Sequence, residues 1–156
     1  MRRKNSFHFL HMGLVAVALL APSQSEGKLG GSADSIETDR HALSAVRRNS
    51  TSHSSYSVHE IESDSANVRE YVSSSGVVFG LAWNGLRHPD LNLLLGPYST
   101  EFHEALKHTS RNRGAKSRSV KTSRLVVQMW GHPRKLQGRA YDPTLIPVGV
   151  TPDEIK

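Results

Sequence analysis

The side chains best suited to chemistry lie close together in the last third of the sequence, around residues 130–142. A histidine, a tyrosine and an aspartate there can act as general acids or bases, and the neighbouring arginines can hold an anion. If residues 135–141 pair with residues 125–130 as a hairpin, several of these side chains converge on one end of a sheet and can build a small-ligand site. The candidates for ligand binding are Trp130, His132, Arg134 and Arg139. The candidates for catalysis, in a small hydrolase or lyase, are His132, Tyr141 and Asp142, with Arg139 beside them. A hairpin that buries Trp130 and Tyr141 in the core explains the same residues without a site.

Other kinds of site find less support in the sequence. His103 and His108 resemble the histidine pair of a zinc metalloprotease helix, but they are five residues apart instead of four. That spacing sets them about 140° apart around a helix, so they cannot grip one ion from one face. There is no Gly-x-Ser-x-Gly turn and no glycine-rich phosphate loop. The absence of cysteine excludes thiol catalysis and cysteine-bound metal. We therefore expect no metal and no cofactor.

A basic stretch follows the histidines. Between Glu104 and Asp142 there are ten lysines and arginines and no acidic residue, which suits contact with a polyanion such as an anionic component of a cell envelope. Residues 110–123 are polar and contain one valine, so they are predicted to form a mobile loop. They carry no aromatic residue to stack on bases, and specific nucleic-acid binding is not expected. The candidate polyanion-binding residues are Arg111, Arg113, Lys116, Arg118 and Lys121.

Alternating apolar residues predict the strands that must position these side chains. The predicted strands cover residues 56–61, 67–72, 76–85, 125–130 and 135–141. In the third of them, alternation places Val77, Phe79, Leu81 and Trp83 on one bulky face, and leaves a flat face at Gly80 that another segment can approach closely.

The remaining segments are predicted to be helical or irregular. Helices are expected at 33–46, after Pro89 and after Pro97, with a flexible lead-in at 27–31 and a serine-rich linker at 47–55. The proline-rich end is expected to be extended, with one helical turn from Thr151. Together these elements predict an α+β fold, with an antiparallel sheet of about five strands and two or three helices packed on it.

The first 25 residues have the order of a secretory signal. Arg2, Arg3 and Lys4 precede an apolar stretch at 9–21, and small residues at Ser23 and Ser25 permit cleavage before Glu26. The apolar stretch is about 13 residues long, shorter than the ~20 that span a bilayer, so no transmembrane segment is expected after cleavage. An uncleaved membrane tether is the alternative. Cleavage leaves one domain at 26–156 and lowers the net charge from +6 to about +3. An exported chain without cysteine favours the periplasm or outer envelope of a Gram-negative bacterium, or its secreted fraction.

Several segments resemble a known family when they are taken in order. They are Leu29-Gly30-Gly31, 68–72, 75–83, Pro89-Asp90-Leu91, Leu94-Leu95-Gly96, 125–128, Gly131-His132, Arg134, 138–141, Pro143 and 153–155. In these segments the chain resembles the short exported proteobacterial proteins grouped as domain of unknown function 2844 (DUF2844). The resemblance implies export and a single domain, and it transfers no catalytic residue. The expected function is a non-enzymatic periplasmic or envelope-associated binding module, with a small hydrolase or lyase and a structural envelope protein as the alternatives.

Overall fold

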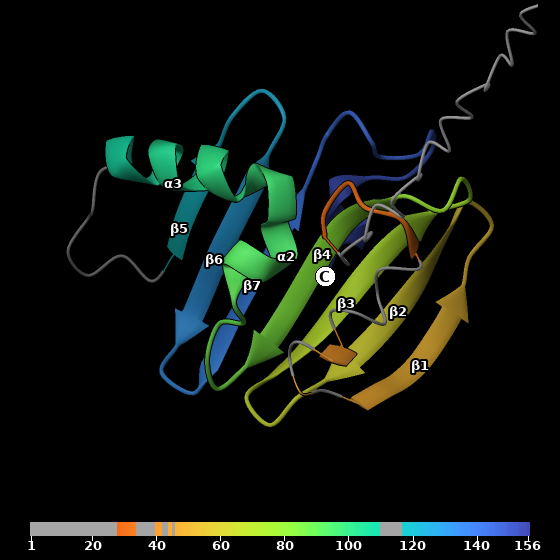
Figure 1. The fold of residues 1–156 in the computed structure, drawn as a ribbon, viewed down its shortest axis with the longest axis horizontal. Helices are drawn as coiled ribbons and strands as arrows, with labels where there is room; N and C mark the ends of the chain where they lie inside the picture. The colour runs from red at the N-terminus through yellow and green to blue at the C-terminus, as the bar shows by residue number, and fades with distance from the viewer. Residues whose placement is uncertain (1–27, 34–39, 42–43, 45, 110–116) are drawn as a thin grey trace, which may run out of the picture.

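The computed structural model describes residues 28–33, 40, 41, 44, 46–109 and 117–156. The described strands form one antiparallel sheet of seven strands in the order β1-β2-β3-β4-β7-β6-β5 (Figure 1). Two meanders, β1 to β4 and β5 to β7, therefore meet where β4 pairs with β7. The strands are β1 Val46–Ser52, β2 Tyr56–Glu62, β3 Ala66–Ser73, β4 Val78–Gly85, β5 Ser117–Lys121, β6 Val126–His132 and β7 Lys135–Tyr141. The predicted antiparallel α+β class is confirmed, with seven strands in place of about five.

One helical stretch connects the two meanders. It comprises α2 (Leu91–Leu95), the 3-10 turn η2 (Gly96–Tyr98) and α3 (Ser99–His108), which follow one another without a break. Asp90 caps its start by accepting hydrogen bonds from the backbone amides of Asn92 and Leu93. The two helices predicted after Pro89 and Pro97 are thus one continuous stretch. No helix in the described ranges is long and apolar enough to cross a membrane.

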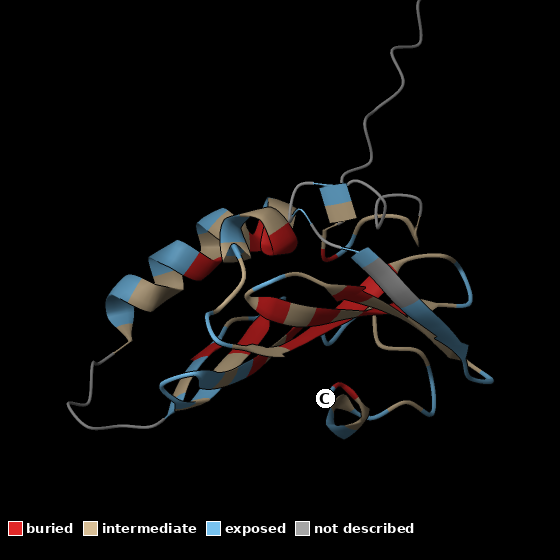
Figure 2. Cartoon of the chain, turned by 90° about the horizontal axis from the view of Figure 1, so that it is seen from below, coloured by how far each residue is buried: buried red, intermediate tan, exposed pale blue. Residues whose placement is uncertain are grey.

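Each face of the sheet has its own cover (Figures 1 and 2). The helical stretch lies on one face, the helix side, where Leu94, Leu95 and Phe102 pack against strand residues such as Leu81 and Trp83. The tail, defined here as residues 142–156 with the 3-10 turn η3 (Pro152–Glu154), lies on the other face, the tail side. Its Ile155 is fully buried against the sheet. The sheet is therefore the middle layer of the molecule.

A β-bulge in β4 changes the predicted faces of that strand. Tyr71 pairs with Gly80 and Val72 pairs with Val78, so Phe79 has no partner on β3. Phe79 consequently packs on the tail side, whereas Val78 joins Leu81 and Trp83 on the helix side. The prediction that Phe79 shares a face with Leu81 and Trp83 is wrong for this reason. The close approach expected at Gly80 is present, because a Cβ atom there would lie 2.8 Å from Ile155 Cδ1.

Three predicted irregular segments are ordered parts of the fold. The linker at 47–55 contains most of β1, and the loop at 110–123 contains β5, whose Val120 is buried. In the lead-in at 27–31, Leu29 is fully buried and its backbone N–H donates to the Leu94 carbonyl (3.0 Å). The predicted helix at 33–46 falls largely outside the described residues; Arg40 and His41 are helical, and Val46 already belongs to β1.

Candidate functional site

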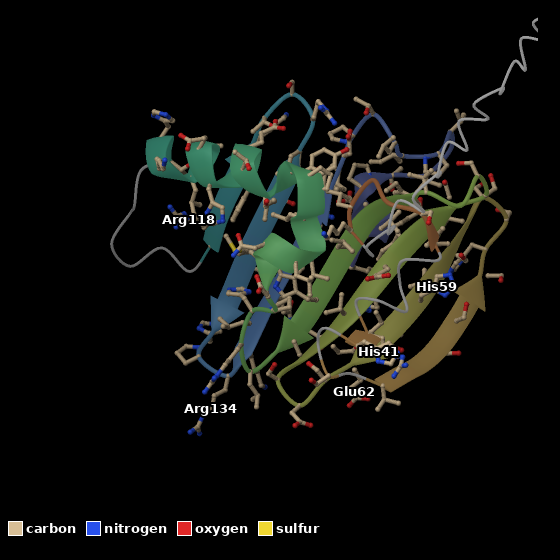
Figure 3. All side chains as sticks on the ribbon, in the orientation of Figure 1. His41, His59, Glu62, Arg118 and Arg134 are labelled. Atoms are coloured by element: carbon tan, nitrogen blue, oxygen red, sulfur yellow. The ribbon has the colours of Figure 1, made fainter. Side chains whose placement is uncertain are left out.

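The structure separates the side chains that the sequence places together around the terminal hairpin. His132 pairs with Lys135 next to the turn, and Arg134 occupies the turn itself with a φ of +66°. Figure 3 shows Arg134 at the tip of the β6–β7 hairpin. Tyr141 and Asp142 lie at the opposite end of β7, about 20 Å away for a strand of this length. His132 therefore does not meet Tyr141 or Asp142, and these three residues do not form one site.

Arg139 lies between these two ends and holds the tail. Its Nε donates to Gln128 Oε1 (2.7 Å), and its Nη1 donates to the Pro152 carbonyl (2.6 Å) and reaches Asp153 Oδ1 (3.4 Å). Tyr141 packs nearby in the tail-side core. Both side chains are thus used to attach residues 152–155 to the sheet.

Asp142 is a buried acceptor whose oxygens are already occupied. Tyr98 donates its hydroxyl proton to Oδ2 (2.6 Å), while the backbone N–H and hydroxyl of Thr144 donate to Oδ1 (2.8 and 2.7 Å). Burial by itself raises the pKa of Asp142, but the hydrogen bonds from Tyr98 and Thr144 outweigh it and hold the pKa below its usual value. Asp142 is therefore a stable anion that joins the helical stretch to the end of β7.

The predicted polyanion-binding residues divide between described and undescribed parts of the chain. Arg111, Arg113 and Lys116 lie outside the described residues. Lys121 is exposed at the end of β5, and Arg118 lies on β5 beside α3 (Figure 3). Its Nη2 donates to the Leu106 carbonyl (3.3 Å). Arg118 is thus partly committed to holding α3 against the edge strand.

A polar cavity that the sequence did not predict lies on the tail side of β1, β2 and β3. We call it the tail pocket; its volume is about 290 Å³. It is lined by Asn49, Thr51 and His53 from β1 and the turn after it, Tyr56, Val58 and Glu60 from β2, Arg69 and Tyr71 from β3, and Glu154 and Lys156 from the tail. Alternation within β2 and β3 brings Tyr56, Glu60 and Arg69 to one face, but two walls could not be foreseen. One is β1, which has the composition of a linker, and the other is the tail, which folds back over the sheet.

Aromatic side chains form one wall of the tail pocket. His53 stacks on Tyr56 with ring centroids 4.5 Å apart, and the Tyr56 hydroxyl donates to Glu154 Oε2 (3.0 Å). Burial and the Glu154 carboxylate both raise the pKa of Tyr56. The Thr151 backbone N–H and the Tyr56 hydroxyl lower the pKa of Glu154, so this pair is a neutral phenol bonded to a carboxylate at neutral pH. The Glu154 charge is thereby already compensated by donors.

Arg69 and Lys156 are the lysine and arginine side chains that line the tail pocket, and Arg69, on β3, has no side-chain partner among the described residues. Its side chain is half-buried, its Nε is buried, and it makes no hydrogen bond or ion pair with any residue of the described ranges. Glu60 is opposite Arg69 in the strand register, but its Oε1 accepts a hydrogen bond from Asn67 Nδ2 (2.8 Å). A half-buried guanidinium without a partner is costly unless an anion pairs with it. Arg69 is therefore the group in this cavity with the greatest capacity to bind an anion.

The tail side also carries two rows of largely polar side chains that cross the sheet. The strand register places Arg69, Ala82, Arg139 and Gln128 in one row, which we call the arginine row. The next row away from the tail contains Asn67, Asn84, Gln137 and Trp130, which we call the amide row. In the part of the chain that the structure describes, no group of three or more His, Asp or Glu side chains is arranged to hold a metal ion.

Comparisons with known proteins identify the family. No curated protein and no solved structure matches the chain significantly. The sequence model of one family, described as "Protein of unknown function (DUF2844)", matches residues 25–155. Because the match covers nearly all of the sequence, including every strand described above, the chain belongs to the DUF2844 family.

Proposed function

We propose that this chain is exported to the bacterial envelope and acts there as a non-enzymatic binding module, with the tail pocket as its binding site. The observation that carries the proposal is Arg69, a half-buried cation that lines a polar cavity and has no partner among the residues the structure describes. Such a group is stabilised by an anionic ligand, and a guanidinium pairs with a carboxylate through two parallel hydrogen bonds.

The other walls of the tail pocket indicate the rest of the ligand. The stacked rings of His53 and Tyr56 offer a flat apolar surface, and Asn49 and Thr51 line the same cavity with hydrogen-bonding groups. A cavity of about 290 Å³ has room for a molecule the size of one sugar ring. The ligand class that fits is therefore a small ring compound with hydroxyl groups and one carboxylate, such as a sugar acid.

Binding is favoured over catalysis by the arrangement of the titratable groups. A hydrolase or lyase needs an acid and a base within reach of one substrate atom. His132 is separated from Tyr141 and Asp142 by the length of β7, and Asp142 is saturated by Tyr98 and Thr144. In the tail pocket, the Tyr56 proton is already donated to Glu154.

Two features of the sequence support export. Residues 1–25 have the cationic, apolar and small-residue order of a signal, and the family match begins at residue 25, next to the predicted cleavage site. An anionic component of the envelope, such as a uronic acid in a glycan, is then the natural source of the ligand.

A titration with sodium glucuronate and with glucose, followed by amide chemical shifts, tests the tail pocket. Glucuronate should shift resonances of β1, β2 and β3, and glucose at equal concentration should bind at least about tenfold more weakly, because it lacks the carboxylate. Arg69→Gln should weaken glucuronate binding by a similar factor. Arg134→Gln, which removes the same charge at the exposed hairpin tip, should have no effect. Equal binding of the two sugars, or unchanged binding by Arg69→Gln, would contradict the proposal.

A further inference from the structure

The turn between β6 and β7 carries an arginine at a position whose backbone favours glycine. Pro133 and Arg134 form this turn, because His132 and Lys135 are the last paired residues of the hairpin. Arg134 has a φ of +66°. A proline followed by a residue with positive φ is the arrangement of a type II turn, in which glycine is preferred at the second position. Backbone strain of this kind is concentrated where a side chain has a function, so the arginine itself calls for a partner.

The cations of this turn have no partner in the part of the chain that the structure describes. Arg134 and Lys135 are exposed, and neither side chain makes a hydrogen bond or ion pair with a described residue. The acidic residues at this end of the sheet are Glu62, on β2, and Asp64, in the turn after it. Strands β3 and β4 separate them from β7, a distance of about 10–14 Å over which salt screens most of the attraction. Figure 3 shows Arg134 at the hairpin tip, well apart from Glu62. The positive charge of the tip is therefore not neutralised by the protein.

Apolar side chains are exposed at the same end of the sheet. Leu86 is 55 % exposed and directly follows the Gly85–Leu136 pair, where the pairing of β4 with β7 ends. Trp130 is 37 % exposed on β6, just before the turn. An exposed leucine and an exposed indole gain nothing in water, whereas both are stabilised at the boundary between lipid head groups and acyl chains, where tryptophan is enriched. The combination of cations and apolar groups on a protruding tip suits a flat bilayer surface.

We propose that this end of the sheet docks on a bilayer that contains anionic phospholipid, through a docking tip made of Leu86, Trp130, Arg134 and Lys135. The two cations pair with lipid phosphates, and a guanidinium does so through two parallel hydrogen bonds. Leu86 and Trp130 enter the layer of head groups. A soluble polyanion would use the cations alone, but a bilayer accommodates all four side chains. The proposal does not rest on the tail pocket, because none of these four residues lines that cavity.

Cosedimentation with vesicles tests the docking tip. The protein expressed from the full sequence is mixed with vesicles of equimolar phosphatidylglycerol and phosphatidylcholine, or of phosphatidylcholine alone. The anionic vesicles should bind the protein at least about tenfold more tightly, and added salt should weaken this binding. Arg134→Gln and Lys135→Gln should each weaken it by about fivefold. Lys121→Gln is the matched control, because it removes an exposed charge beside Val126, at the other end of the sheet, and should change nothing.

A glycine at the turn separates a binding role of Arg134 from a structural one. Arg134→Gly relieves the positive φ, so its thermal midpoint should equal or exceed that of the unmodified protein, while its binding to anionic vesicles falls as in Arg134→Gln. Leu86→Ala and Trp130→Ala should each weaken binding by about three- to tenfold, the range for partial burial of one apolar side chain. Val148→Ala, which truncates a 99 % exposed side chain of the tail, should bind normally.

The outcomes distinguish a bilayer from other partners. Equal binding to neutral vesicles, or unchanged binding by Lys135→Gln, would overturn the proposal. It also fails if heparin binds as tightly as the anionic vesicles while Leu86→Ala and Trp130→Ala bind like the unmodified protein, because the tip would then be a site for soluble polyanions. Residues 1–25 are the same in every variant, so any affinity of theirs for lipid cancels from each ratio. Lys135→Gln should retain its response to glucuronate, which keeps a failure of the docking tip distinct from a failure of the tail pocket.

Discussion

Asp142 is the buried charge on which the attachment of the helical stretch to the sheet depends. Replacing it with asparagine removes the anion that accepts the Tyr98 hydroxyl proton at 2.6 Å and both donors of Thr144. Hydrogen bonds to a charged group contribute about 1.5–3 kcal/mol each, so Asp142→Asn should lower the free energy of unfolding by at least that amount. Urea denaturation at pH 7 measures the loss. Asp153→Asn is the matched control, because Asp153 is exposed and its ion pair with Arg139 contributes less than about 1 kcal/mol.

Because the pKa of Asp142 is lowered in the folded protein, the stability that its carboxylate contributes should depend on pH. Its pKa in the folded protein is below the ordinary value of about 3.9, so the ionised form stabilises the fold fully above pH ~4. That stabilisation is lost as the pH falls from about 4 through the folded pKa. Asp142→Asn should therefore lose less stability than the unmodified protein over this acid range. An equal acid dependence of the two proteins would show that Asp142 is not the titrating group.

The imidazole of His88 predicts a second dependence of stability on pH, at higher pH than that of Asp142. Its Nδ1 accepts the indole N–H of buried Trp83 at 2.8 Å, and burial lowers the pKa of His88. The neutral imidazole is therefore favoured in the folded state, and stability should begin to fall as the pH drops below the unfolded value of about 6.5. His88→Asn keeps an acceptor for Trp83 but does not titrate. Its thermal midpoint should change less than that of the unmodified protein between pH 7.5 and 5.5, and a parallel decrease in the two would assign the effect to other histidines.

At the scale of the elements, the pairing of β4 with β7 depends on a glycine, Gly138, at a position with no room for a side chain. A Cβ atom on Gly138 would meet the ring of Trp83, and it would lie 2.8 Å from the backbone oxygen of Gln128. Trp83 is buried and its indole is bonded to His88, so the ring has little freedom to move. Gly138→Ala should therefore lower the free energy of unfolding by about 1–3 kcal/mol or more.

Gly80→Ala is the matched control for this substitution. Its added methyl group would meet the end of the Ile155 side chain, at 2.8 Å, which can adjust more easily than an indole or a backbone oxygen. Urea denaturation should show a smaller loss for Gly80→Ala than for Gly138→Ala. The reverse order would mean that the tail is held more rigidly than Trp83.

The sequence predicted the elements whose burial alternates and missed those that are held by pairing alone. β2, β3, β4, β6 and β7 are inner strands and carry the apolar residues of the two cores. The described side chains of the edge strands β1 and β5 bury little, and Val120 is the buried residue of β5, so neither shows a periodic pattern. Their order comes from backbone hydrogen bonds to a neighbouring strand, which composition does not reveal.

The same reasoning explains the outcome for the candidate sites. Residues 130–142 are close in sequence, but an extended strand carries its two ends far apart, so His132 cannot meet Asp142. The tail pocket needs β1 and the tail as walls, and the amide row needs the register of four strands. The bulge at Phe79 is likewise a property of pairing, because alternation along β4 alone assigns this side chain to the wrong face.

At the scale of the whole molecule, the segment around Leu29 connects the layers. Its backbone bonds to the Leu94 carbonyl of α2, and Gly30 and Gly31 bond to Val78 at the start of β4. Gly30, with a φ of +80°, lies against the Tyr98 ring, which in turn binds Asp142. A segment directly after the predicted signal thus contacts the helical stretch and the sheet together. Export and folding are compatible only if processing leaves Leu29 in place.

This requirement gives a final prediction. Mass spectrometry of the protein from envelope fractions of the native host should find a mature chain that begins at Glu26, three residues before Leu29. Leu29 is fully buried, so Leu29→Ala should lower the free energy of unfolding by about 2–5 kcal/mol, whereas Lys28→Ala, one residue earlier, should cost less. A native chain that begins beyond Leu29 would contradict the cleavage site and the role of this segment, and a cytoplasmic location would contradict export. Because Leu29 belongs to the same hydrophobic core as Trp83 of the sheet and Leu94 of the helical stretch, its loss should lower the stability of the whole sheet in one cooperative transition.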